Sequence, residues 1–132
     1  MSSLSKMNQA KMEDVFDMHG GYVNNYNNQS FQNLIIKTTG IDVYCGEYED
    51  GWYPSKAKKL RRFVEVESDE NVGKVLLALL NDRDAHIQLK IEIGDIESDP
   101  YEKFSQDLRA AAISMIKWIF YVPCKKEIPF FF

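Results

Sequence analysis

Five cationic side chains fall within seven consecutive residues near the middle of the sequence. They are Lys56, Lys58, Lys59, Arg61 and Arg62. Ser55 precedes them and is a good N-cap, so we expect all five on one helix. Such a group of cations could contact the phosphates of a nucleic acid or of a nucleotide ligand. Alternatively, the cations form a solvated helix face and pair with nearby carboxylates, as Arg61 could with Glu65 four residues later.

The residues that usually carry out catalysis or bind metals are few and far apart. The sequence contains two histidines, His19 and His86, and two cysteines, Cys45 and Cys124. A nucleophile or general base needs a second group within hydrogen-bond reach, and no spacing pairs these four residues. Zinc modules use close pairs of ligands, which the sequence lacks. We therefore expect no catalytic residue, no metal site and no cofactor, and we expect each cysteine to be a buried free thiol.

Two further patterns fall short of a functional motif. Arg83 stands three residues before His86, whereas helical HEPN ribonucleases use an Arg and a His at wider spacing. We interpret residues 82–86 as the C-terminal turn of a helix. The acidic residues within 47–50 and 95–99 match no cation-binding loop, and loop solvation and helix capping explain them better. The sequence also lacks a phosphate-binding glycine loop and a serine elbow, so it favours a binding module over an enzyme.

Length, composition and charge limit the class of protein. The 132 residues fit one domain, and 45% hydrophobic residues are ordinary for a globular protein. The net charge of -4 and the pI of about 5.2 argue against a nucleic-acid-binding domain, although a local basic patch could suffice. The polar start lacks the apolar core of a secretory signal, and the apolar stretch 110–122 is too short to span a bilayer. We expect a cytoplasmic protein that does not contact a membrane.

Apolar spacing predicts a mainly α fold, a compact bundle of about five helices. The predicted helices cover about residues 6–18, from a cap at Asn28 or Ser30 to Gly40, and about 56–67, 70–81 and 100–121. Ser68 or Asp69 is the expected cap of the helix at 70–81. Asp99 and Pro100 mark the start of the last helix, with Asp99 as its cap. We expect a single domain over residues 1–132, in which 10–82 form a helical core and 83–132 add a strand-like segment and a long helix.

Residues 87–93 carry the one clear strand signal. Ile87, Leu89, Ile91 and Ile93 alternate strictly with polar residues. A lone strand is not stable, so this segment would have to pair with another extended segment, such as 41–44 or 22–26, or with a second copy of the chain. The alternative is that residues 87–93 continue the fourth helix. The fold class therefore includes at most a small β element at 41–44 and 87–93.

Four short blocks, taken in order, resemble a known family. The blocks are Gly21-Tyr22-Val23, Gly40-Ile41-Asp42, Ser55-Lys56-Ala57-Lys58-Lys59-Leu60-Arg61 and Val72-Gly73-Lys74. Residues 10–82, which contain them, resemble the N-terminal domain of AbiJ-type abortive-infection proteins of bacteria. In that family such a domain usually precedes an effector, often a HEPN ribonuclease. The resemblance implies a non-catalytic sensor or adaptor in phage defence, although no effector motif follows residue 82.

The first functional hypothesis is therefore a protein-interaction or sensor module of an antiphage system, with an effector domain or a second copy, as in a homodimer, as its partner. The cations named above are the candidates for an anionic ligand. The candidates for protein contact are Ile87, Leu89, Ile91, Ile93, Phe130, Phe131 and Phe132. A nucleic-acid-binding module that uses the basic helix 55–62 is the alternative. A small nuclease-like enzyme is the third class.

Overall fold

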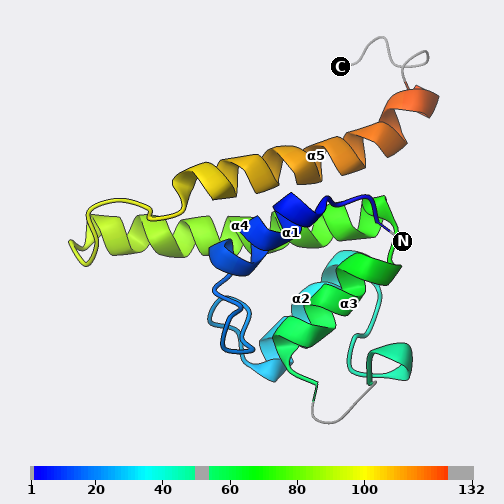
Figure 1. The fold of residues 1–132 in the computed structure, drawn as a ribbon, viewed down its shortest axis with the longest axis horizontal. Coiled ribbons are helices and arrows are strands. Elements are labelled where there is room, and N and C mark those ends of the chain that lie inside the picture. Colours follow the sequence, from blue (N-terminus) through cyan, green and yellow to red (C-terminus); the bar gives the residue numbers. More distant parts are fainter. Residues whose placement is uncertain (1, 50–53, 125–132) are drawn as a thin grey trace.

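The structure is a computed structural model that describes residues 2–49 and 54–124 (Figure 1). Its helices are α1 (Lys6–Val15), α2 (Asn28–Thr39), the short 3-10 helix η1 (Gly46–Glu49), α3 (Lys56–Val66), α4 (Asp69–Glu92) and α5 (Glu102–Cys124). The described residues contain no β-strand. The mainly α fold class is thus confirmed.

Side-chain caps fix where the helices begin. Ser5, Ser55 and Ser68 accept hydrogen bonds from the backbone N–H three residues later, at the starts of α1, α3 and α4. At the start of α2, Asn27 and Ser30 form a reciprocal capping box. Gly40 ends α2 in the left-handed conformation, with a φ of 81°. The caps predicted at Ser55 and Ser68 are therefore confirmed, and the cap of α2 lies one residue before the predicted Asn28.

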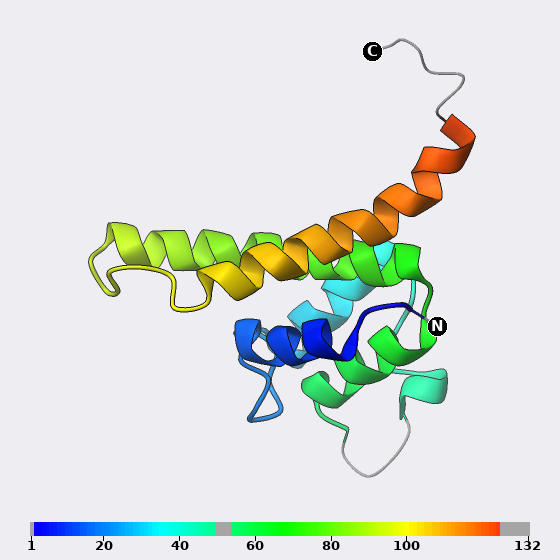
Figure 2. The ribbon, with the colours of Figure 1, turned by 45° about the horizontal axis from the view of Figure 1, so that its top comes forward.

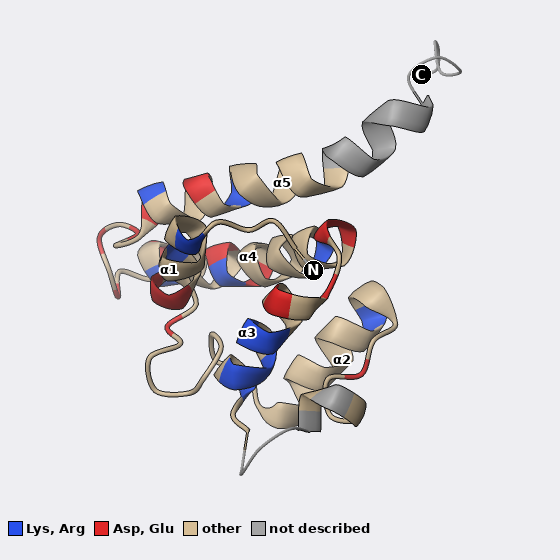
Figure 3. Ribbon diagram, turned by 45° about the vertical axis from the view of Figure 1, so that its right-hand side comes forward, with Lys and Arg blue, Asp and Glu red and all other residues tan. Residues whose placement is uncertain are grey.

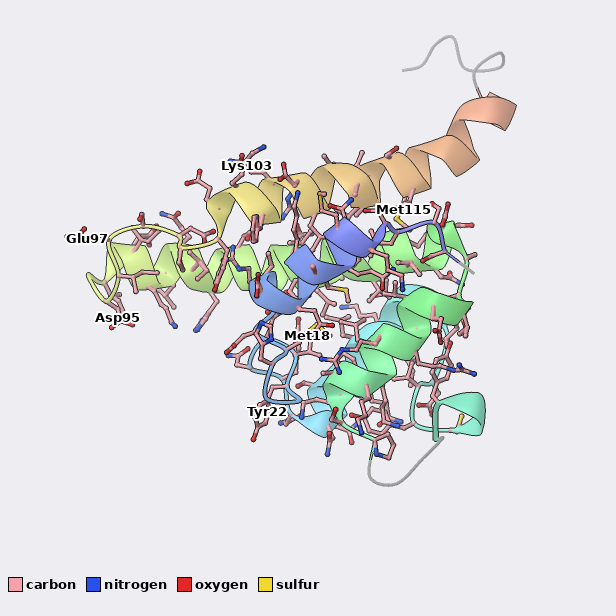
Figure 4. All side chains as sticks on the ribbon, viewed as in Figure 1. Met18, Tyr22, Asp95, Glu97, Lys103 and Met115 are labelled. Atoms are coloured by element: carbon pink, nitrogen blue, oxygen red, sulfur yellow. The ribbon has the colours of Figure 1, made fainter. Side chains whose placement is uncertain are left out.

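The helix α4 runs through the middle of the molecule (Figures 1 and 2). It packs against α2 on one side and against α5 on the other, and α5 also packs against α1. The core between the helices is apolar and includes fully buried Phe16, Phe31, Phe63 and Leu76. In Figure 4 the labelled Met18 lies inside this body.

Gly73 determines how closely α5 approaches α4. A Cβ atom at this position would lie 2.8 Å from Cγ1 of Ile116 and 2.9 Å from the backbone oxygen of Ala112. Atoms cannot pack at these distances without a shift of the neighbouring helix. The absence of a side chain at Gly73 therefore lets the two helices pack backbone to backbone.

The strand prediction for residues 87–93 is wrong, and the helical alternative is correct. These residues continue α4, which ends at Glu92 rather than near residue 81. Because a helix satisfies its own backbone hydrogen bonds, the segment needs no strand partner. Residues 41–44 are likewise irregular: the backbone N–H of Tyr44 donates to Oδ1 of Asp42 at 2.8 Å. Residues 82–86, predicted as a terminal turn, lie in the interior of α4.

The longer α4 changes the shape of the molecule. Its C-terminal half and the start of α5 form an antiparallel helical hairpin that extends beyond α1, α2 and α3 (Figures 1 and 2). We call residues 87–101 the hairpin end. Asp95 and Glu97 lie at its tip (Figure 4). Over the described residues, no helix combines the length and the apolar character needed to cross a membrane.

Candidate functional site

Lys59, one of the five predicted ligand-binding cations, is buried in the fold. Its Nζ donates hydrogen bonds to the backbone oxygens of Val43 and Tyr48, at 3.0 and 3.1 Å. The ammonium group also lies 4.5 Å from the centre of the Tyr44 ring. Only 4% of Lys59 is exposed. The side chain therefore binds the segment between α2 and α3 to the core of the protein. It is not available to a ligand at the surface.

The other cations of α3 make separate local contacts. Arg61 forms two 2.7 Å hydrogen bonds with the carboxylate of Glu13 on α1, and these bonds lower the pKa of Glu13. Arg62 pairs with Glu65 at 3.1 Å, in place of the predicted pair between Arg61 and Glu65. Nζ of Lys56 lies 5.2 Å from the centre of the Tyr22 ring, and Lys58 is exposed. Figure 3 shows the cations along α3.

The four aliphatic residues predicted as contact residues in the hairpin end divide into two pairs. Leu89 is 53% exposed and Ile93 is 69% exposed, whereas Ile87 and Ile91 are partly buried. Leu89 and Ile93 stand four residues apart, so they share one face of the helix end. The other predicted contact residues, 130–132, lie outside the described residues.

A network of charged side chains closes the hairpin at its base. The guanidinium of Arg83 on α4 forms hydrogen bonds of 2.6 and 2.5 Å with the two carboxylate oxygens of Asp99, just before α5. Arg83 also donates to Asp84 at 3.0 Å, and Asp84 accepts a 2.8 Å bond from Arg109 on α5. Only 6% of the Arg83 side chain is exposed. The network therefore joins α4, the connector and α5 in a largely buried position.

Asp99 has two roles in this network. Its Oδ1 accepts a hydrogen bond from the backbone N–H of Tyr101 at 2.9 Å. Because α5 begins at Glu102, the predicted start at Pro100 with Asp99 as the cap is two residues too early. Burial alone would raise the pKa of Asp99, but the hydrogen bonds from Arg83 and Tyr101 outweigh burial and hold the pKa below its ordinary value. Asp99 is therefore a carboxylate at neutral pH and balances the charge of Arg83.

A pocket of about 430 Å³ lies beside this network, between α4 and the end of α1. Both histidines of the chain line it, His19 from the turn after α1 and His86 from α4. Lys90, one helical turn after His86, lines the same wall, and Asp17 lines the wall of the α1 turn. Tyr101 contributes from the segment that leads into α5. Sequence reasoning left these side chains unpaired because they are far apart along the chain.

The turn between α1 and α2 has an unusual backbone where it lines the pocket. Asp17 and Asn24 have φ values of 52° and 49°, and they are the non-glycine residues with positive φ in the described part of the chain. Asp and Asn tolerate this left-handed conformation better than most residues. The backbone N–H of Asn24 donates to the oxygen of Phe16 at 2.7 Å, which folds the turn back on itself. The adjacent His19 is held with its Nε2 2.8 Å from Oδ1 of Asp14.

The structure tests the predicted burial of one of the two cysteines. Cys45 is exposed, so its predicted burial is wrong; its sulfur lies 3.5 Å from the backbone oxygen of Asp42 in an irregular surface segment. The side chain of Cys124 lies outside the described residues. Within the part of the chain that the structure describes, no three His, Cys, Asp or Glu side chains are grouped as a metal site would require.

The chain was compared with models of protein families, with curated proteins and with solved structures. None of the three comparisons gave a match. The function is therefore inferred from the chain's own residues.

Proposed function

We propose that the chain is a non-catalytic sensor or adaptor of a bacterial abortive-infection system and that its hairpin end docks on a partner protein. The observation that carries this proposal is the projection of the α4–α5 hairpin beyond the other helices (Figure 1). Leu89 and Ile93 are exposed on that projection, and the buried Arg83–Asp99 pair holds its base. A rigid helix end with two aliphatic side chains one turn apart suits a hydrophobic groove.

The surroundings of Leu89 and Ile93 indicate the chemistry of the partner surface. Glu92, Asp95 and Glu97 are exposed on the same hairpin end. Charges at the rim of an interface steer the approach of a partner and select against like-charged surfaces. The partner surface should therefore be apolar at its centre and basic at its rim. An effector protein that bears such a groove would fit this description.

The abortive-infection setting depends on the family resemblance, whose blocks take part in the packing of the fold. The backbone oxygen of Gly21 accepts a 3.1 Å hydrogen bond from the N–H of Ala57, so the first block contacts the third. Lys59 of the third block binds the segment that follows the second block, through the oxygen of Val43. Gly73 of the fourth block permits the packing of α4 against α5. The four blocks thus include residues that hold one fold together, as expected of a family signature.

The nucleic-acid-binding alternative receives less support from the same structure. Of the cations on α3, Lys59 is buried, Arg61 is neutralised by Glu13 and Arg62 pairs with Glu65. Phosphate contacts need cations that are free to replace counterions along a backbone. Lys56 and Lys58 alone would give a weak and strongly salt-dependent contact.

A phage challenge in the bacterial host that encodes the protein tests the proposal. The double variant Leu89→Lys/Ile93→Lys places two charges on the hairpin end, and Met7→Lys/Ile36→Lys is the matched control on α1 and α2, where both residues are also exposed. We expect wild type and control to reduce plaque formation and the hairpin variant to lose protection, because buried charges would oppose docking. Abortive infection also requires that the protected culture collapse at a high ratio of phage to cells.

Two results would contradict the proposal. Protection by the hairpin variant at the wild-type level would exclude the hairpin end as the docking surface. Absence of protection by the wild-type chain in its own host would exclude the abortive-infection role. Light scattering of the purified chain then identifies the partner type: a salt-independent dimer that the hairpin variant abolishes would make the partner a second copy.

A further inference from the structure

We propose that the pocket between α1 and α4 binds a nucleoside monophosphate, with the phosphate held by His86 and Lys90 and the base facing Asp17. This inference deepens the sensor role proposed above and rests on it, because it names the class of ligand that would be sensed. The binding itself is a property of the isolated chain and is measured without a partner.

The size and the construction of the pocket suit a small organic ligand. Its volume of about 430 Å³ lies within the range of small-molecule sites, which is about 300 to 1,000 Å³. Its walls come from the end of α1, the turn before α2, the second half of α4 and the segment that leads into α5. A ligand here would touch both the body and the hairpin, because Arg83 lines the pocket and also closes the hairpin base.

The pocket is basic at Lys90, toward the C-terminal end of α4, and acidic near the end of α1 and at Asp82. His86 and Lys90 lie one turn apart on α4, whereas Asp14 and Asp17 come from the opposite side, at the end of α1 and in the turn after it. A ligand that matches this separation has an anionic end and an end rich in hydrogen-bond donors. A nucleotide whose base carries an amino group has both, because base amino groups donate to carboxylate and amide oxygens.

Three of the polar side chains that line the pocket, His19, Asp14 and Asp82, are already held in place. Nε2 of His19 lies 2.8 Å from the carboxylate of Asp14, and Asp82 accepts a 2.5 Å hydrogen bond from the hydroxyl of Tyr26. Side chains that are fixed before binding lose little conformational entropy when a ligand arrives. The left-handed backbone at Asp17 adds to this order, since such conformations persist where the surrounding structure determines them and often occur at ligand sites.

Two features favour a nucleoside monophosphate over inorganic phosphate and over a nucleoside triphosphate. The pocket includes an aromatic surface, the ring of Tyr101, which is 40% exposed and stacks on Phe104, and bases stack on such rings. An inorganic phosphate would leave this surface and the carboxylates unused. A triphosphate would bring several negative charges close to Asp14, Asp17 and Asp82, which also line the pocket.

Isothermal titration calorimetry of the purified chain with AMP, GMP, CMP and UMP tests the proposal, with inorganic phosphate and the matching nucleosides as reference probes. We expect at least one monophosphate to bind, and we expect each reference probe to bind at least about tenfold more weakly. His86→Ala and Lys90→Gln should each weaken binding about tenfold or more, because the first removes a hydrogen-bond donor to the phosphate and the second removes the positive charge that faces it. Lys103→Gln removes the same charge from the exposed face of α5 and should leave affinity unchanged.

Each contrary result would overturn the proposal. These results are the absence of binding by all four monophosphates at about 1 mM, equal affinity for inorganic phosphate, and equal affinity in the Lys90 and Lys103 variants. The thermal unfolding of each variant shows that it is folded. The docking proposal fails separately: the Leu89→Lys/Ile93→Lys variant should bind the nucleotide like wild type, whatever its effect on phage.

Discussion

The substitution Asp99→Asn should lower the stability of the protein strongly, although it replaces only one oxygen of the side chain by an amino group. The variant keeps the shape of the side chain but removes the negative charge that faces Arg83. In the native protein, both carboxylate oxygens accept hydrogen bonds from Arg83, at 2.6 and 2.5 Å. The two side chains are 15% and 6% exposed, so water replaces little of the lost interaction. The variant would leave the guanidinium of Arg83 with one neutral acceptor at that position.

The size of the effect follows from the type of bond. A hydrogen bond to a charged group contributes about 1.5 to 3 kcal/mol, and loss of one partner of a buried ion pair costs about 3 to 5 kcal/mol. Asn retains one acceptor oxygen, and Asp84 still accepts a bond from Arg83 at 3.0 Å. We therefore expect a loss of about 2 to 3 kcal/mol in the free energy of unfolding, which lowers Tm by about 6 to 12 °C in a domain of this size.

The effect should also depend on pH in a defined direction. The pKa of Asp99 is lower in the folded state than its ordinary value of 3.8, so its carboxylate contributes stability above the unfolded pKa and loses it as pH falls through the folded pKa. The difference between wild type and Asp99→Asn should be complete above about pH 5 and should shrink below about pH 3.9. Lowered pKa values at Glu13, Asp42 and Asp107 affect both proteins equally and cancel in the difference.

Urea unfolding followed by circular dichroism at pH 7, 5 and 3 measures this difference. Asp95→Asn is the matched control, because Asp95 is exposed in the same connector and the change is chemically identical. A surface substitution of this kind should change stability by less than about 0.5 kcal/mol. Equal stability of the two variants at pH 7, or a difference that does not shrink at pH 3, would refute the role assigned to the Arg83–Asp99 pair.

Two further predictions concern packing in the body of the protein. Gly73→Ala should lower stability by about 1 to 2 kcal/mol, although Ala normally favours a helix, because its Cβ would meet Ile116 and the backbone of Ala112; a Tm at or above that of wild type would show that α5 yields at this point. Lys59→Met should lower stability by about 2 to 3 kcal/mol, because two backbone oxygens lose a charged donor. Lys58→Met removes the same charge from an exposed position, so equal Tm values for these two variants would contradict the buried role of Lys59.

Local signals in the sequence predicted the parts of the fold that local physics controls. Ser55 and Ser68 begin α3 and α4 as predicted, because a cap needs only its own side chain and the N–H three residues later. The stop at Gly40 is local in the same sense, since its φ of 81° is accessible to glycine without strain. These signals were sufficient to predict a mainly α chain.

The signals that failed depend on contacts between distant segments. The alternation within 87–93 resembles a strand, but α5 lies along the helix and covers only part of it, so Leu89 and Ile93 are left exposed. Lys59 looked like one surface cation among five, and nothing in its own neighbourhood shows that Val43 and Tyr48 would surround it. The spacing of apolar residues in so short a segment does not distinguish a strand from the continuation of a helix.

The candidate sites could not be predicted from the sequence, because they too depend on contacts between distant segments. His19 and His86 stand far apart in the chain, and they meet in one pocket only because the turn after α1 folds against α4. Asp99 stands sixteen residues after Arg83, and this spacing belongs to no recognised motif. The bend of the hairpin nevertheless brings the two side chains together. The sequence predicts the cap of the last helix at Asp99, but α5 begins three residues later, at Glu102, and Asp99 instead accepts hydrogen bonds from Arg83 and from the N–H of Tyr101.

The shared position of Arg83 determines how the two proposals can be separated. Its guanidinium lines the pocket and, through Asp99, also holds the hairpin base, so a substitution there would disturb ligand binding and docking together. His86 lines the pocket but makes no described bond to the connector, and Leu89 is exposed away from the pocket lining. Variants at these two positions therefore report on one surface each. If a nucleotide and a partner are coupled, Arg83 and Asp99 form the physical connection through which one would influence the other.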